Sequence, residues 1–363
     1  MESHCSISEK AVEEGNFQGG AYVFYRLPFE RTYTYISRKN EPEAFSSVPF
    51  PYTGTGVVIA PFHITNETPL LFVAPDYISK NAIPAESEST ETYSYKDDES
   101  VQRSTYYAEF RKAMQRLSYG KCRKMVLSRR LHLTLNCDAM MPVQLFHKAC
   151  RLYPGCYVTL WWTEKSGCWL AATPEELLVK EDSHWRTMAL AGTMHIKDAE
   201  EEKAYPEWSL KNREEQKYVS TYLDRQLRAV TESRSISPTY PSRTGDLVHL
   251  RTDFTFTLKE GSDIAYVLKR LHPTPAVCGI PRETARRAIL EDESSPRKYY
   301  AGFTGPLNME DTTGLYVSLR CMNILDKREI ELYAGGGLLK NSEFQSEWDE
   351  TCHKMQAMLR LFR

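Results

Sequence analysis

The chain alternates between helical and strand-like patterns of hydrophobic and polar residues. Apolar residues recur three and four positions apart in several stretches, which predicts helices because an α-helix turns about 100° per residue. Short runs rich in β-branched and aromatic residues, bounded by turn residues, predict strands. Helices are predicted at 101–117, 141–153, 211–230, 264–271 and 282–290 and in a terminal segment after 337; strands are predicted at 21–25, 32–36, 56–61, 70–75, 124–135, 157–163, 168–173, 315–325 and 328–333.

These elements come in mixed order, which favours an α+β fold with large sheets over a regular βαβ alternation. Residues 1–100 are expected to be a strand-rich part of the same fold. Within them, the polar and acidic stretch 85–100 lacks apolar periodicity and predicts a surface loop. Residues 101–363 hold the remaining elements and all of the candidate chemistry.

The predicted strand 315–325 is apolar at alternate positions. Leu319 falls on its apolar side and Arg320 on its polar side, if the strand is regular throughout. A turn at Asp326-Lys327 would pair this strand with 328–333 as a hairpin. Arg320 would then suit either a carboxylate contact or solvent.

Composition and charge narrow the class of protein. The 363 residues include 46 basic and 48 acidic side chains, and the formal net charge of −2 gives no argument for binding nucleic acid or an anionic membrane. The longest apolar runs fall far short of the roughly 20 residues that span a bilayer, and the N-terminus lacks a signal-peptide pattern. Nine cysteines without a CxxC pair are typical of free thiols in a reducing compartment. We therefore expect a soluble, cytoplasmic protein.

Two predicted helices carry acidic residues at informative positions. Glu215 lies on the apolar side of helix 211–230, where a carboxylate is costly unless it is paired, bound to a metal or in a cleft. In the terminal helix, Glu347, Glu350 and Lys354 are spaced by three and four residues and share one face. By spacing alone, this second group also fits a solvated surface with weak ion pairs.

Familiar catalytic and phosphate-binding motifs are absent. The run from Gly335 to Gly337, followed by Lys340 and Ser342, is not a phosphate loop because Leu339 stands where GxxxxGK[ST] needs a glycine. The chain also has no HExxH and no GxSxG. Any metal or acid–base chemistry must come from dispersed residues.

A set of motifs between 107 and the C-terminus occurs in the order typical of one enzyme family. The motifs are LAATPEELL, LAGT, the acidic helix around Glu215, HPTPAVCGIP, RKYYAGFTG, YVSLR, and YAGGG with its EWDETCHK tail. The set closely resembles the chorismate-utilising enzymes, and most nearly the isochorismate synthases. The resemblance implies an α+β sandwich of two large antiparallel sheets with helices outside. It also makes 101–363 the chorismate-binding catalytic region.

The resemblance further implies a Mg²⁺ ion and a set of contacts to chorismate. Glu215 and Glu350 match the metal carboxylates of the family, with Glu347 nearby through water. Such a set is typical of Mg²⁺, which commonly takes one or two carboxylates together with waters and an anionic substrate group. The positions expected to contact chorismate or to line its site are Thr193, His272, Ala276, Tyr300, Leu319, Arg320, Tyr333, Gly335, Gly337 and Lys354.

Two more positions match the proton-transfer groups of the family. Lys124 matches the lysine that activates water in isochorismate synthases, where ammonia-using relatives usually have glutamine. Glu175, rather than Glu176, matches the general acid, which must be protonated near neutral pH. The implied reaction is attack of water at C2 of chorismate, a shift of the double bond, and loss of the C4 hydroxyl with a proton from Glu175. The product, isochorismate, would feed menaquinone or siderophore biosynthesis.

A few positions separate this interpretation from related enzymes. Ala191 stands where aminodeoxychorismate synthases place a nucleophilic lysine, and the segment beginning at His272 resembles isochorismate synthases more than salicylate synthases. A salicylate synthase, an anthranilate-type amine-forming enzyme and a chorismate-binding pseudoenzyme are the alternatives. The chain departs from the family at Gln216 for histidine, Gly336 for alanine and Phe344 for proline. We expect a monomer without a glutamine amidotransferase subunit.

Overall fold

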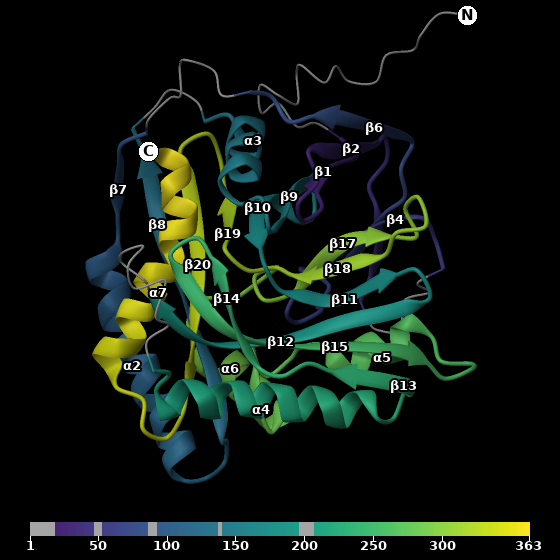
Figure 1. Cartoon of the computed structure of the whole chain (residues 1–363). Coiled ribbons are helices and arrows are strands. Elements are labelled where there is room, and N and C mark those ends of the chain that lie inside the picture. Colours follow the sequence, from purple (N-terminus) through teal and green to yellow (C-terminus); the bar gives the residue numbers. More distant parts are fainter. Residues whose placement is uncertain (1–18, 47–52, 86–92, 137–139, 196–206) are drawn as a thin grey trace, which may run out of the picture.

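Two large antiparallel sheets form the framework of the molecule, and helices pack on them (Figure 1). The structure is a computed structural model that describes residues 19–46, 53–85, 93–136, 140–195 and 207–363. The α+β class and the two-sheet architecture expected from the sequence are therefore confirmed. Among the described residues, no helix is long and apolar enough to cross a membrane, and all seven cysteines have free thiols.

Each sheet contains ten strands among the described residues, and every strand pair is antiparallel. The first sheet has the order β16 (Gly279–Ile280), β8 (Lys124–Leu135), β20 (Glu329–Leu338), β19 (Cys321–Ile324), β10 (Gly167–Thr173), β9 (Tyr157–Thr163), β1 (Ala21–Arg26), β2 (Thr32–Arg38) and β6 (Tyr77–Ala82), with β7 (Tyr95–Asp97) beside β8. The second has the order β13 (Thr231–Ile236), β15 (Leu247–Leu258), β12 (His184–His195), β11 (Glu176–Glu181), β18 (Gly314–Val317), β17 (Phe303–Leu307), β4 (Gly56–Ala60), β5 (Leu70–Val73) and β3 (Glu43–Phe45), with β14 (Tyr240–Thr244) beside β15.

The central strands of the first sheet, such as β9 and β10, are buried on both faces, which explains their continuous apolar runs. In β9, Tyr157 and Trp161 point into the main core, whereas Val158 and Leu160 point into a second core on the opposite face of the sheet. Successive side chains of a strand alternate between faces, so a strand covered on both sides needs apolar residues at nearly every position.

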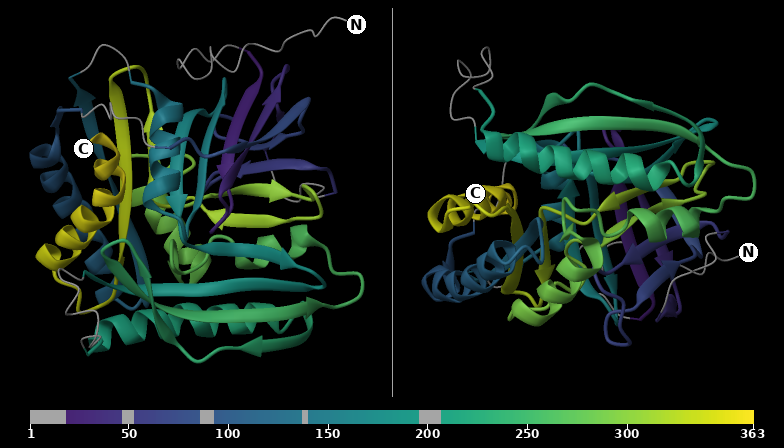
Figure 2. Two further views of the ribbon diagram at one scale, coloured as in Figure 1. Left: turned by 45° about the horizontal axis from the view of Figure 1, so that its top comes forward. Right: turned by 90° about the horizontal axis from the view of Figure 1, so that it is seen from below.

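The helices complete these two cores. α3 (Pro142–Leu152) packs on β9 and β10, α7 (Phe344–Leu359) on β20, α2 (Glu99–Ser118) on β8, and α4 (Leu210–Leu227) on β12 and β15; α5 (Ile264–Leu271), α6 (Arg282–Asp292) and a short 3₁₀ turn (Arg360–Phe362) are the remaining helical segments described. α2 and α7 lie side by side, while α4 runs along the long strands of the second sheet (Figure 2). The predicted helices are thus confirmed, with ends shifted by a few residues.

Three predictions about local structure need correction. The loop expected at 85–100 is shorter, because β7 begins at Tyr95 and α2 at Glu99; residues 86–92 lie outside the described part. The three glycines lie inside β20 and not after it. The predicted strand 315–325 is two strands, since the chain leaves the second sheet after Val317 and enters the first at Cys321.

Candidate active site

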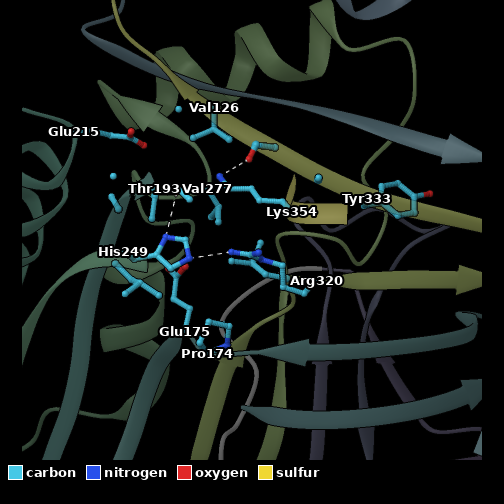
Figure 3. A pocket seen from close by; sticks show the side chains of 18 of the residues that line it. Val126, Pro174, Glu175, Thr193, Glu215, His249, Val277, Arg320, Tyr333 and Lys354 are labelled. Atoms are coloured by element: carbon cyan, nitrogen blue, oxygen red, sulfur yellow. Dashed lines mark hydrogen bonds between the residues drawn. The ribbon is translucent and has the colours of Figure 1, made fainter. Parts of the chain in front are cut away.

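A pocket lies where residues from both sheets and from α4 and α7 converge (Figure 3). Its lining runs from Val126 to Lys354, more than 200 positions apart in the chain, as expected for a site built from dispersed residues. Most of the predicted site residues line it: Glu175, Thr193, Glu215, Ala276, Tyr300, Leu319, Arg320, Tyr333, Gly335, Gly337 and Lys354. Ala191, the position that separates related enzymes, also lines the pocket.

Four predicted residues lie outside the lining. Lys124 is fully buried behind Glu215, and its Nζ is 3.1 Å from Glu215 Oε1. Glu350 and Glu347 lie on α7 beside the pocket, where Glu350 contacts the pocket residue Lys354. His272 lies against Phe303, and burial lowers the pKa of its ring to about 3. His272 therefore does not line the pocket in which a ligand would bind.

Glu175 is a buried acid whose protonation suits a proton donor. It follows Pro174 in the short connection between β10 and β11, and its backbone N–H donates to Thr173 Oγ1 at 3.2 Å. Burial raises the pKa of Glu175 to about 7, although Lys124, Lys354 and Arg320 act in the opposite direction. A substantial protonated fraction at neutral pH follows. Glu175 and Glu215 reach the pocket from different sides in Figure 3.

Three carboxylates from α4 and α7 gather beside β20, and we call Glu215, Glu347 and Glu350 the carboxylate cluster. Each contacts a lysine: Lys124 contacts Glu215 at 3.1 Å, Lys354 contacts Glu350 at 2.5 Å, and Lys211 contacts Glu347. The face predicted for the terminal helix is therefore buried and paired, not solvated.

The pKa values of Glu350 and Glu347 respond to these lysines. Burial acts to raise the pKa of Glu350, but the Lys354 and Lys211 ammonium groups outweigh it and hold the pKa below its usual value. Burial raises the pKa of Glu347 to about 7, against the opposing effect of Lys211. Unequal environments thus separate the acidities of two carboxylates one helical turn apart.

The glycines of β20 make room for the cluster. A Cβ at Gly337 would lie 2.0 Å from Glu215 Oε1, and a Cβ at Gly336 would lie 3.2 Å from Glu347 Oε2. A Cβ at Gly335 would lie 2.8 Å from the Tyr300 hydroxyl. These close approaches explain the requirement for glycine in a strand that otherwise disfavours it.

A side chain that the sequence analysis missed, His249, lies at the centre of the pocket. Its Nδ1 is 3.2 Å from Thr193 Oγ1, and its Nε2 is 3.0 Å from Arg320 Nη2. Burial, with Arg320 and Lys354, holds the pKa of His249 well below its usual range, so the ring is neutral. The sequence feature that could have revealed His249 is a histidine at an inward position of the apolar strand β15.

Arg320 reaches His249 from an unusual backbone conformation. It lies in the crossover between β18 and β19 with φ of 46°, and its carbonyl accepts a hydrogen bond from the Ala172 N–H at 3.0 Å. Alternation along a regular strand therefore could not predict its direction, and its placement on a polar strand face was wrong. The guanidinium instead supplies the pocket with a partly buried positive charge.

Gln216, one of the departures from the family, has a clear structural role. Its Nε2 donates to Ala189 O at 3.0 Å and to Thr252 Oγ1 at 3.1 Å, which ties α4 to β12 and β15. The side chain next to Glu215 is therefore anchored on two strands. Phe344, another departure, packs against Tyr107 and Phe110 of α2 at the start of α7.

The carboxylate cluster has the donor chemistry of a Mg²⁺ site. Carboxylate oxygens are the ligands that Mg²⁺ prefers, and glycines at 336 and 337 keep the space beside them open. In the described part of the chain, no three acidic, histidine or cysteine side chains converge on one point as a ready metal cage. The arrangement fits an ion held by one or two carboxylates with water, and Glu215 and Glu350 are the candidates.

Comparison with known proteins agrees with this geometry. Residues 67–363 match the family described as chorismate binding enzyme. Isochorismate synthase MenF of Escherichia coli K12 is 31% identical over 259 residues, which are 69% of this chain and 58% of that relative, so the match spans little more than half of its length.

Two further matches cover more of the chain. Isochorismate synthase DhbC of Bacillus subtilis is 28% identical over 336 residues, which are 89% of this chain and 81% of that relative. The solved structure of MenF, the menaquinone-specific isochorismate synthase of Escherichia coli, superposes with a TM-score of 0.80 at 20% identity and covers 99% of this chain and 92% of that one. At this identity, the structural match establishes the shared fold.

Proposed function

We propose that this chain, which belongs to the chorismate-binding enzyme family, is an isochorismate synthase that interconverts chorismate and isochorismate with Mg²⁺ as cofactor. The relatives named above carry this activity in their names, and the proposal is supported by a pocket lined by Glu175, Arg320 and Lys354, with Lys124 and Glu350 beside it. The proposal also includes that the protein is a cytoplasmic monomer and needs no amidotransferase subunit.

The burial of the Glu175 carboxyl in the pocket, which raises its pKa, is the observation that carries this proposal. Loss of a hydroxide from C4 is unfavourable, so a nearby acid must give the departing oxygen a proton. Burial keeps the pKa of Glu175 at about 7, and a bound dicarboxylate would favour the neutral acid further because like charges disfavour ionisation. Arg320 and Lys354, which line the same pocket, are available to bind the substrate carboxylates.

Lys124 is the base in this mechanism. It accepts a proton from water as the water oxygen bonds to C2, while the ring double bond shifts and the C4–O bond breaks with the proton from Glu175. Acting as a base requires the neutral amine, so the contact between Lys124 and Glu215 must loosen in the complex with substrate.

Glu215 and Glu350 are the residues that would hold Mg²⁺, and the ion would supply positive charge to fix a carboxylate of chorismate. Because Gly335 and Gly337 have no side chains, the Tyr300 hydroxyl and the Glu215 carboxylate can lie directly against β20. Neutral His249 fixes the directions of Thr193 and Arg320 at the opposite side of the pocket through its two ring nitrogens.

The experiment that tests the proposal is to incubate the purified protein with chorismate, with and without Mg²⁺, and to resolve the products chromatographically. We expect isochorismate in the presence of Mg²⁺, with the reverse reaction from isochorismate. Salicylate with pyruvate would identify a salicylate synthase instead, and tight chorismate binding without any product would identify a pseudoenzyme.

The base is tested separately with Lys124→Gln. We expect a loss of isochorismate formation of about 10²- to 10⁴-fold, because general base catalysis contributes this much. Lys121→Gln is the control, since that lysine is exposed three positions before Lys124. Full water-dependent activity of Lys124→Gln would exclude Lys124 as the base.

A further inference from the structure

Lys211 lies where it can compete with a metal ion for the carboxylate cluster. It is the second residue of α4, one helical turn before Glu215, and its ammonium contacts Glu347 of α7. The contact joins two helices that are separated by more than 100 residues in the chain. Burial acts to lower the pKa of Lys211, but Glu347, Glu350 and Glu215 outweigh it and raise the pKa, so the side chain is charged.

The cluster needs such a charge when it holds no ion. Glu215 and Glu347 are buried and Glu350 is partly buried beside them, and like charges withdrawn from water repel unless cations compensate them. Lys211 is the only lysine in the described part of the chain whose ion-pair contact is to Glu347. Removing it without replacement would leave that carboxylate buried and unpaired.

Lys211 also differs from the other two lysines in how it is held. Lys354 donates a second hydrogen bond to the Gly335 carbonyl at 2.8 Å, and Lys124 is fully buried within β8. Lys211 instead lies in the first turn of its helix, and Glu347 is its one hydrogen-bond partner in the described part of the chain; its side chain is 18% exposed, much like that of Lys354 at 16%. Rotation about its side-chain bonds can therefore carry the ammonium to solvent without moving α4.

We propose that the Lys211 ammonium is a built-in competitor of Mg²⁺, which neutralises the carboxylate cluster in the metal-free protein and leaves Glu347 when the ion binds. A divalent cation held at Glu215 and Glu350 repels an ammonium beside the same carboxylates. This inference rests on the metal site in the proposed function, and it assigns to Lys211 a role in setting metal affinity and not in the chemical step.

The test is calorimetric titration of MgCl₂, at constant ionic strength, into the metal-free full-length protein and its variants. We expect Lys211→Met to lower the Kd for Mg²⁺ by about tenfold or more, because a competing positive charge has been removed. The same variant should have a lower Tm without Mg²⁺ and a larger rise of Tm with it. Two variants are the controls. Lys211→Arg keeps the charge, and Lys217→Met removes an exposed charge from the same helix. For both, the Kd for Mg²⁺ should stay within about twofold of the wild-type value.

A second measurement uses the unmodified sequence. Brief acetylation with and without Mg²⁺, followed by peptide mass spectrometry, should show several-fold more modification of Lys211 with the ion and no change at Lys217. An unchanged Kd in folded Lys211→Met, or unchanged labelling of Lys211, would overturn the inference alone. If neither the wild type nor any variant bound Mg²⁺, both this inference and the proposed metal site would be overturned. The product assay without Mg²⁺ would then test the proposed activity independently of the metal.

Discussion

Two regions of the active site can be compared: the side of the pocket that holds Glu175, and the carboxylate cluster. Both use carboxyl groups, but for opposite tasks. Glu175 is buried, and in the described part of the chain no lysine or arginine contacts its carboxyl, so its pKa rises to about 7. Glu215 and Glu347 are buried as well and Glu350 is partly buried, but each contacts a lysine ammonium. Burial alone therefore does not decide the role of a carboxyl group in this molecule.

The balance between burial and the nearby cations decides it. Lys354 and Lys211 together hold the pKa of Glu350 below its usual value, whereas burial outweighs Lys211 at Glu347 and raises that pKa to about 7, as at Glu175. An ammonium within ion-pair distance favours the charged carboxylate, which can bind a cation, whereas a buried carboxyl without such a partner favours the neutral acid, which can donate a proton. Two functions that require opposite charges on the same residue type can then coexist within one pocket.

The strongest test of this contrast is the pair Glu175→Gln and Glu176→Gln. We expect Glu175→Gln to lower kcat by about 10²- to 10⁴-fold, because an amide cannot supply the proton. Glu176 contacts Arg186 through a partly exposed ion pair, and its substitution should leave kcat nearly unchanged. Equal effects of the two substitutions in the isochorismate assay would remove Glu175 from the role of acid.

The cluster side is tested by adding a methyl group at either of two adjacent glycines. Gly337→Ala should displace the Glu215 carboxylate, since the new Cβ would lie 2.0 Å from Oε1, and a displacement of this size costs about 100-fold in activity. The obstructing atom is at the end of a flexible side chain, so Tm should change little.

Gly336→Ala is the matched control, because its Cβ would lie 3.2 Å from Glu347 Oε2 and needs only a small adjustment. We expect activity and Mg²⁺ affinity close to those of the wild type. Loss of both in Gly336→Ala but not in Gly337→Ala would reverse the assignment of Glu215 and Glu347.

The pH dependence of kcat/KM sharpens the comparison further. Because the raised pKa of Glu175 is about 7, its neutral form dominates below pH 7 and disappears above it. Activity should therefore fall about tenfold per pH unit on the alkaline side as the proton donor is lost. The residual activity of Glu175→Gln should lack this decline, and a decline that persists in the variant would belong to another group.

The smallest expected effect concerns the anchoring of α4. Gln216→Ala removes two buried hydrogen bonds, to Ala189 O and Thr252 Oγ1, and should lower the free energy of unfolding by about 1–3 kcal/mol. Activity should fall only a few-fold, since Glu215 keeps its other contacts. Gln226→Ala, on the same helix with one partly buried bond to Arg270, should destabilise the protein less in the same denaturant titration.

Much of the fold could be predicted because its signals are local. The helix at 264–271 and the strand at 157–163 have the predicted bounds, since apolar periodicity and turn residues mark them within a few positions. The strand predicted at 315–325 failed because periodicity cannot show that a chain changes sheets. Arg320 turns there through a left-handed conformation that no alternation reveals.

The sequence by itself determined the secondary structure, the family and the identity of most pocket residues, because these depend on short patterns and on their order. Only the tertiary structure decided that His249 is central, that Lys211 contacts Glu347, and that the pKa of Glu175 is raised while that of Glu350 is lowered. The physical reason is that the charge of a side chain depends on its burial and on cations within a few ångströms. In this protein those cations come from segments far away in the chain.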